Sequence, residues 1–235
     1  DSIMGKRFKT VPLAVLSTTM GLLAPIPNGA DVPHSIDDAW DVAQGVKVTS
    51  NSKALSGNEP LDMFGQRGSR NGQNHNPGVF IFDNWGAEHF VEWKTPSPVS
   101  IRAFELILIH DGDIPRRAIS KFRLLGFAEE GGEFVELYST DIKVPYQTPP
   151  KHPMLTLRID LPSTFVGKQF RAEFQSNENY SHNGPRIVEL DGYAVAFDDL
   201  IEDAWQEKYF GANFMHNPDA GADADPDKDG LTNLQ

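Results

Sequence analysis

Short stretches in which apolar and polar residues alternate are the strongest constraint on how this chain can fold. The clearest is LTLRIDL at residues 155–161, where every second residue is leucine or isoleucine. Such alternation places one face of a β-strand in a core and the other face in water. Residues 170–174 repeat the pattern, and residues 104–109, FELILI, are apolar on both faces, as expected of a central strand.

Eight runs of this kind, separated by turn-forming residues, predict an all-β domain. Their ranges are 79–82, 90–94, 100–109, 121–127, 134–138, 154–161, 170–175 and 186–195. Residues 129–132, EEGG, predict a hairpin turn, and the 20 glycines and 17 prolines suit a loop-rich β protein. Antiparallel strands in this number, without long helices, predict a β-sandwich or a barrel.

The N-terminal end differs from this β region. Residues 1–30 begin with a basic stretch that holds Lys6, Arg7 and Lys9, continue with a mostly apolar run without charge, and end on small residues. That layout predicts a secretory signal peptide, with a disordered leader as the alternative. The β domain then spans residues 31–196, and we expect the protein to be secreted or displayed on the cell surface.

A short amphipathic helix is predicted for residues 197–211. One helical face would hold Leu200, Ile201, Ala204, Trp205, Lys208 and Tyr209. Asp199 with Glu202 three residues later matches a capping box, and Gly211 would end the helix. We expect this helix to pack on the sandwich or on the segment that follows it.

The remaining residues, 212–235, are predicted to form an acidic loop segment. From residue 198 onward the chain has ten acidic and two basic residues, so most of its net charge of −12 lies at this end. This acidity gives no electrostatic basis for binding nucleic acid and instead suits cations. The chain has no cysteine, which excludes disulfides and thiolate chemistry.

The last eleven residues, DPDKDGLTNLQ, resemble the calcium loops of dockerins and thrombospondin type 3 repeats, in an ending common in exported bacterial proteins. A loop of the EF-hand type takes ligands at positions 1, 3, 5, 7 and 9, needs glycine at position 6 and an acid at position 12. The predicted calcium ligands are Asp225, Asp227, Asp229, the Leu231 carbonyl and Asn233. Position 12 would follow Gln235, so we expect the natural chain to continue with an acid and further domains. A solvated acidic tail is the alternative.

Three stretches of the β region resemble the discoidin-like family, the coagulation-factor type C branch of the galactose-binding-like jelly rolls. They are HFVEWKTPSPVSIRAFELI, with a tryptophan before Pro-Val-x-Ile, the hairpin RAISKFRLLGFAEEGGEFVELYS, and KQFRAEFQSNENYSHNGPRIVELDGYA, with Ile-x-Glu-Leu-x-Gly near its end. The resemblance spans residues 46–194 and implies an all-β, antiparallel jelly-roll β-sandwich. The lack of a cysteine pair joining the domain ends departs from the lipid-binding clotting proteins and fits bacterial members better.

Sequence motifs for catalysis are missing. The chain contains no His-Glu-x-x-His, no Gly-x-Ser-x-Gly and no phosphate-binding glycine loop. The seven histidines lack metal-ligand spacing, and residues 110–113, HDGD, are interpreted as a polar turn after a buried strand. Glu88 and Glu92 flank a strand and are interpreted as structural. We therefore expect a noncatalytic module.

Jelly-roll modules hold ligands on loops at one end of the sandwich, and three loops here are rich in side chains that bind sugars. They span residues 65–76, with Trp85 beyond, 110–117 and 176–186. The candidate ligand-binding residues are Arg70, His75, Trp85, His110, Asp113, Arg116, Arg117, Asn179, Tyr180 and His182. They predict recognition of an extracellular glycan or another cell-surface component, as in cell adhesion. The alternatives are a structural domain of a surface protein without a small ligand, and an accessory domain of an exported hydrolase whose catalytic domain lies beyond residue 235.

Overall fold

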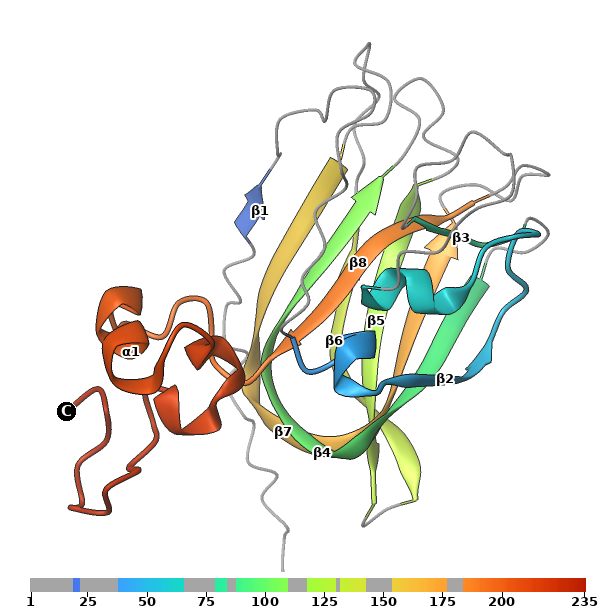
Figure 1. Cartoon of the computed structure of the whole chain (residues 1–235). Helices are drawn as coiled ribbons and strands as arrows, with labels where there is room; N and C mark the ends of the chain where they lie inside the picture. The colour runs from blue at the N-terminus through green and yellow to red at the C-terminus, as the bar shows by residue number, and fades with distance from the viewer. Residues whose placement is uncertain are drawn as a thin grey trace, which may run out of the picture.

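The computed structural model is a two-layer β-sandwich with a small C-terminal segment beside it (Figure 1). It describes residues 19–21, 38–65, 79–83, 88–109, 118–129, 132–142, 154–176 and 184–235. The strands are β1 (Thr19–Gly21), β2 (Lys47–Asn51), β3 (Phe80–Ile81), β4 (Glu88–Ile109), β5 (Ile119–Ala128), β6 (Glu133–Asp141), β7 (Met154–Ser176) and β8 (Arg186–Tyr193). The short helices are η1 (Val42–Gln44), η2 (Pro60–Phe64), α1 (Asp203–Phe210), η4 (Phe214–His216) and η5 (Pro218–Ala220). The predicted antiparallel all-β fold is confirmed.

Two long strands, β4 and β7, run through both layers. Residues 88–94 of β4 pair with residues 169–175 of β7, and residues 103–109 pair with residues 154–160. The register shifts between these two ladders, and Figure 1 shows both strands bending together at the lower end of the sandwich. Each long strand had been predicted as two separate strands, because the TPSP sequence inside β4 is typical of a turn.

The bend divides the strand order β3-β8-β4-β7-β5-β6 into two layers. One layer contains the first half of β4, the second half of β7, and strands β2, β5 and β6. The other contains the second half of β4, the first half of β7, and strands β1, β3 and β8. Outer strands thus attach to a continuous antiparallel pair that is shared by both layers.

Aromatic side chains fill the space between the layers. Trp40, Trp93 and Phe170 contact one another there, and all three are fully buried. The predicted inward faces of residues 155–161 and 170–174 are buried, as the alternation required. A second apolar cluster lies on the outer face of β3, β4 and β8, which agrees with the two-sided apolar pattern of residues 104–109. Its buried members are Val79, Ile81, Ile107, Ile109 and Val188.

The structure adds two strands that the sequence pattern did not predict. Strand β2 is mostly exposed, so its sequence KVTSN lacks the apolar alternation of the core strands. Strand β1 lies within the segment predicted as a signal peptide and pairs with residues 156–158 of β7. The predicted hairpin between β5 and β6 is confirmed, and Gly132 supplies the left-handed backbone of the turn with φ of 67°.

The predicted amphipathic helix is wrong in its start and in its buried face. Helix α1 begins at Asp203. Leu200 adopts a left-handed backbone with φ of 67°, so it lies outside the helix, and its side chain is 77% exposed. Asp199 does not cap the helix but accepts a hydrogen bond from the backbone N–H of Ile201. The buried helix residue is Gln206, whose Nε2 donates to Asp199 and to the carbonyl of Ala220. Gly211 ends the helix as predicted.

The C-terminal segment packs against the sandwich through a small apolar core. Phe214 and Ala220 are buried together with Val195, which follows β8. The carbonyl oxygen of Met215 accepts hydrogen bonds from the N–H groups of Ala194 and Val195, at 2.8 and 3.2 Å. Within the described ranges the chain offers no helix of the length and apolarity that a membrane crossing requires.

Candidate functional site

The strand ends that carry the predicted binding loops lie at one end of the sandwich. Both ends of β4 and of β7 lie at the upper end in Figure 1, because each strand bends back on itself. The residue pairs at this end are Glu88 with Gln175, Ile109 with Met154, Ile119 with Ser176 and Ile81 with Arg186. Residues 110–117 and 177–183 leave from these strand ends and Trp85 precedes β4, so the topology brings their attachment points together.

The predicted glycan-binding residues themselves fall outside the described part of the chain. These are Arg70, His75, Trp85, His110, Asp113, Arg116, Arg117, Asn179, Tyr180 and His182. Their role as a binding rim stays a prediction.

A hollow of about 560 Å³ lies on the outer face of the layer that contains β2, β5 and β6, next to the same end. The sequence did not predict this sheet-face hollow, because strands β4, β5 and β7 each contribute only a few polar residues to it. Its described lining is Ser52, Glu88, His89, Phe90, Lys121, Arg123, Arg171, Glu173, Phe174 and Gln175. Glu88 was interpreted as structural from the sequence, yet it is exposed and lines the hollow.

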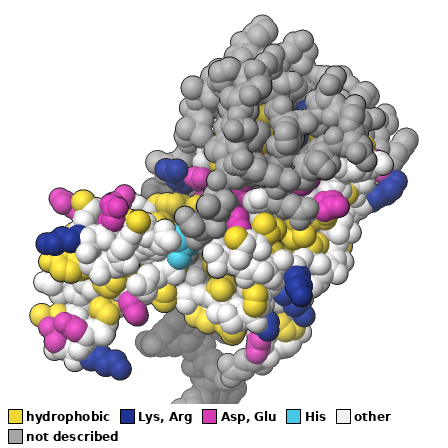
Figure 2. Space-filling view, viewed as in Figure 1, with side chains coloured by type: hydrophobic (Ala, Val, Ile, Leu, Met, Phe, Trp, Pro, Cys, Tyr) yellow, Lys and Arg dark blue, Asp and Glu magenta, His cyan; other side chains and the backbone are white. Residues whose placement is uncertain are grey.

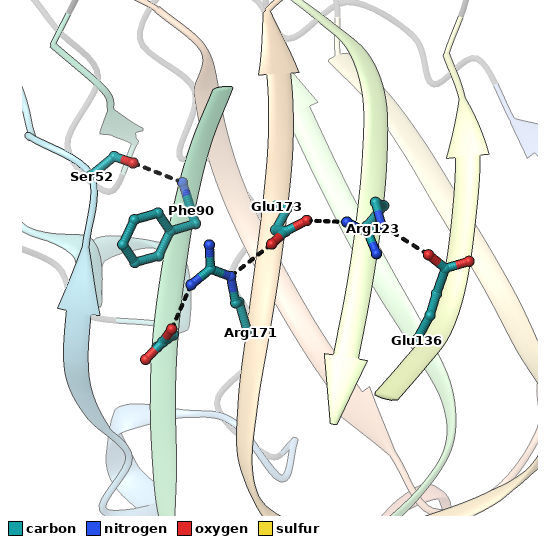
Figure 3. Close-up of polar contacts among 7 residues, drawn as sticks. Ser52, Phe90, Arg123, Glu136, Arg171 and Glu173 are labelled. Atoms are coloured by element: carbon teal, nitrogen blue, oxygen red, sulfur yellow. Dashed lines mark hydrogen bonds and ion pairs between the residues drawn. The ribbon is translucent and has the colours of Figure 1, made fainter. Parts of the chain in front are cut away.

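A row of alternating charges crosses the strands beside the sheet-face hollow, as Figure 3 shows, and three of its residues, Arg123, Arg171 and Glu173, line the hollow. Arg171 donates to Glu92 at 2.6 Å and to Glu173 at 2.8 Å. Arg123 donates to Glu173 at 2.6 Å and to Glu136 at 2.8 Å, and the hydrogen bond to Glu136 raises the pKa of this guanidinium. This charge ladder (Glu92, Arg171, Glu173, Arg123 and Glu136) joins β4, β7, β5 and β6 and confirms the structural role predicted for Glu92.

An aromatic ring lies beside the charge ladder. The guanidinium carbon of Arg171 is 4.0 Å from the ring centroid of Phe90, within cation–π distance. Ser52 on the neighbouring strand end accepts a hydrogen bond from the Phe90 N–H at 3.0 Å. Because Arg171 is also held by two carboxylates, the ring and the guanidinium form a fixed flat surface in the hollow.

The acidic C-terminal segment brings the predicted calcium ligands together. Carboxylate oxygens of Asp225, Asp227 and Asp229 lie within 4.8 Å of one another, and Figure 2 shows acidic side chains on the outer side of this segment. Gly230 has φ of 93°, which provides the sharp bend expected at position 6. The buried Oδ1 atom of Asp225 has no hydrogen-bond partner within the described residues. These observations fit a cation bound by the three carboxylates.

The other two predicted ligands are less closely tied to that cluster. Leu231 is exposed and donates its N–H to Asp229. The side-chain nitrogen of Asn233 donates to the carbonyls of Asp219 and Gly221, at 2.8 and 2.9 Å, and so attaches the loop to the preceding segment. Coordination by the Leu231 carbonyl and Asn233 stays a prediction.

Three buried acids lie in strand β8 or against it. Asp38 accepts hydrogen bonds from the N–H groups of Trp40 and Gly192, at 2.7 and 3.0 Å, and burial raises its pKa to about 7. Burial also raises the pKa of Glu189 to about 11, and raises that of Asp191 well above its usual range. The nearby charges of Asp38 and Asp41 raise the pKa values of both β8 acids further.

Comparisons with known proteins found similar solved structures but no family. No protein-family model matches the chain, and no curated protein matches it. Solved structures similar to it include a family 32 carbohydrate-binding module from Streptococcus pneumoniae EndoD, with 13% identity over 66% of this chain and 98% of that chain, and a TM-score of 0.47. Another is the family 32 module of Clostridium perfringens NanJ in complex with galactose, with 6% identity over 66% of this chain and 97% of that chain, and a TM-score of 0.44.

A third similar structure is chitosan-binding module 1 of a chitosanase/glucanase from Paenibacillus sp. IK-5, with 13% identity and a TM-score of 0.42. The match covers 65% of this chain and 98% of that chain. The names of these three structures describe them as carbohydrate-binding or chitosan-binding modules.

Proposed function

We propose that this chain is a secreted, noncatalytic module that binds carbohydrate on the loops at one end of its sandwich, as part of a larger extracellular or cell-surface protein. The observation that carries the proposal is topological. Residues 110–117 connect β4 to β5, residues 177–183 connect β7 to β8, and the strand ends that they join all lie at the same end of the sandwich. Strand β4 begins at this end, three residues after Trp85. These segments are rich in the aromatic, amide, histidine and arginine side chains that hold sugar rings and hydroxyl groups.

The predicted sugar-binding residues of the loops are tested by replacing Trp85, Arg116 or Tyr180 with alanine. Each variant should lose about tenfold or more of its affinity on a broad glycan array, because a stacked ring or a bidentate arginine contact is removed. Melting temperatures should stay nearly unchanged, since these residues are predicted to lie in loops. Wild-type protein that binds no glycan on such an array would favour the structural-domain alternative.

A second proposed property is calcium binding by the C-terminal segment. Asp225, Asp227 and Asp229 would supply the ligands, with a cation neutralising three carboxylates that otherwise repel one another. Bound calcium would stiffen the segment that links the sandwich to any following domain.

The calcium site should be weak in this chain and tighter when completed. Calorimetric titration is expected to give a Kd on the order of millimolar or poorer, the loose end of the range for such loops. Adding a glutamate after Gln235, with a few residues beyond it, should tighten binding about tenfold or more by supplying a bidentate acid. Asp225→Ala in that extended chain should abolish the heat of binding. Equal binding by the extended chain with and without Asp225→Ala would show that the segment is only a solvated acidic linker.

A further inference from the structure

We propose that the sheet-face hollow is a second saccharide subsite, which binds the sugars of a neutral oligosaccharide next to those held by the loops. This inference rests on the proposed glycan-binding function and extends it from the end of the sandwich onto its side. The ligand class would then be a chain of several sugars rather than a single terminal sugar.

The hollow lies next to the strand ends that lead into the predicted binding loops. Glu88 is the first residue of β4, three residues after Trp85, and its partner across the ladder is Gln175 at the end of β7. Lys121 of β5 pairs with the same Gln175 from the other side. These three side chains therefore form a row across the sheet at the strand ends that lead into the predicted binding loops.

This row offers polar groups that no described residue uses. The side chains of Glu88, Lys121 and Gln175 make no hydrogen bond or ion pair with any described residue. Together they offer a carboxylate acceptor, an ammonium donor and an amide that does both, which matches the mixed donor and acceptor character of sugar hydroxyl groups. One row further down, by contrast, Arg123 and Glu173 are paired in the charge ladder.

A flat surface, held in place by ion pairs, lies next to this row on the sheet. Phe90 and Arg171 lie in contact there, and Arg171 is held by Glu92 and Glu173. Apolar C–H faces of a sugar ring can pack on such a surface while the ring hydroxyls reach that row. Because the arginines are already positioned, little side-chain entropy is lost when a ligand binds.

Charge balance selects a neutral ligand. The charged groups in and around the hollow are Glu88, Glu92, Glu136 and Glu173 against Lys121, Arg123 and Arg171. Both arginines are paired with carboxylates, and the charge of Lys121 is balanced by that of Glu88 in the same row, so a uronate or sulfate would find no excess of positive charge. A neutral glycan meets no such penalty.

The test compares Lys121→Ala/Gln175→Ala and Glu88→Ala with wild type on a glycan array. The array should hold neutral galactans, mannans, xylans, glucans and chitin, from single sugars to hexasaccharides, with pectate and hyaluronan oligosaccharides as acidic counterparts. We expect the double variant to lose about tenfold or more in affinity for the longer neutral chains, because two or three hydrogen bonds are removed. Binding of single sugars should be unchanged, whereas Trp85→Ala should weaken both.

The matched control is Lys94→Ala/Gln169→Ala. Lys94 and Gln169 are paired across the same two strands and lie on the same outer face, but outside the hollow. This variant should bind every chain length as wild type does, and all variants should keep the wild-type melting temperature. Wild-type affinity of the Lys121→Ala/Gln175→Ala protein for long chains would overturn the subsite and leave the loop site standing. Preference of the wild type for acidic chains would overturn the neutral assignment, and a wild type that binds no glycan would overturn both sites.

Discussion

Replacing Gly192 with alanine is expected to destabilise the sandwich by about 3 kcal/mol or more, the upper part of the range for overpacked cores. A Cβ atom at this position would lie 2.7 Å from two ring atoms of Trp40 and 2.9 Å from Cδ1 of Ile101. Trp40 is fully buried, with its ring centroid 5.1 Å from those of Trp93 and Phe170, so the indole has no space into which it can move. Chemical denaturation followed by tryptophan fluorescence measures the loss.

Gly221→Ala is the control for that experiment. A Cβ atom there would be 3.5 Å from the nearest atom, the carbonyl oxygen of Pro218, and the backbone φ is −65°. Its effect should stay within about 0.5 kcal/mol, as for most substitutions away from the core. Trp40→Phe should recover part of the loss in the Gly192→Ala background, because the smaller ring leaves room for the methyl group. Unfolding of Gly192→Ala at the same denaturant concentration as wild type would contradict the close contact.

Gly192 also shows how far the sequence pattern carries. It is the glycine of the Ile-x-Glu-Leu-x-Gly stretch that resembles discoidin-like domains, and the structure explains it by the indole of Trp40 that lies against it. The backbone of Gly192 also bonds to Asp38 and Ala39. Those contacts join the start of the sandwich to its last strand, in a chain that has no cysteine.

The strands and their faces were predictable because burial alternates with the same period as the backbone. The continuity of β4 was not, because Pro96 and Pro98 are typical of a turn, while the structure places them in the irregular part of a bent ladder. The helix prediction failed for a different reason. The 3.6-residue periodicity predicted a buried apolar face, but Leu200 is exposed. The buried residue of α1 is Gln206, which is held by its hydrogen bonds to Asp199 and Ala220.

The candidate site was predictable only in part. Loop composition predicted a sugar-binding rim, and this stays a prediction because the rim residues lie outside the described part of the chain. The sheet-face hollow was not predictable, since Glu88, Lys121 and Gln175 each look like the ordinary wet residue of an alternating strand. Only the register of β4, β5 and β7 brings them into one row.

Raising the pH from about 5 to about 8 is expected to lower the free energy of unfolding, and Asp38 accounts for the part of the loss between about pH 4 and pH 7. Asp38 is 1% exposed, and its Oδ2 atom has no hydrogen-bond partner in the described structure. Burial raises its pKa from 3.8 to about 7, with a further contribution from the neighbouring charge of Asp41. The folded state therefore keeps a proton that the unfolded chain has already released, so stability is complete below the lower pKa and is lost as the pH rises to the higher one.

The difference between a pKa of 3.8 in the unfolded chain and about 7 in the folded protein corresponds to a loss of about 4 kcal/mol in the free energy of unfolding as the pH rises between these values. Glu189 and Asp191 face the same region, and their raised pKa values extend the decline to higher pH. Asp38→Asn should remove the part below about pH 7, because the amide cannot ionise while its oxygen still accepts from Trp40 and Gly192.

The experiment is equilibrium unfolding at a series of pH values, in buffer that contains a chelator so that no cation compensates the carboxylates. Asp38→Asn should lie close to wild type in stability near pH 5, where both side chains are neutral in the folded protein and accept the same hydrogen bonds, and should be more stable near pH 8, where the wild-type carboxylate is ionised. Asp203→Asn, on the exposed first turn of α1, serves as the control and should follow the wild-type profile. A wild-type stability that rises between these pH values, or an Asp38→Asn profile parallel to that of wild type, would show that Asp38 does not hold its proton in the folded protein.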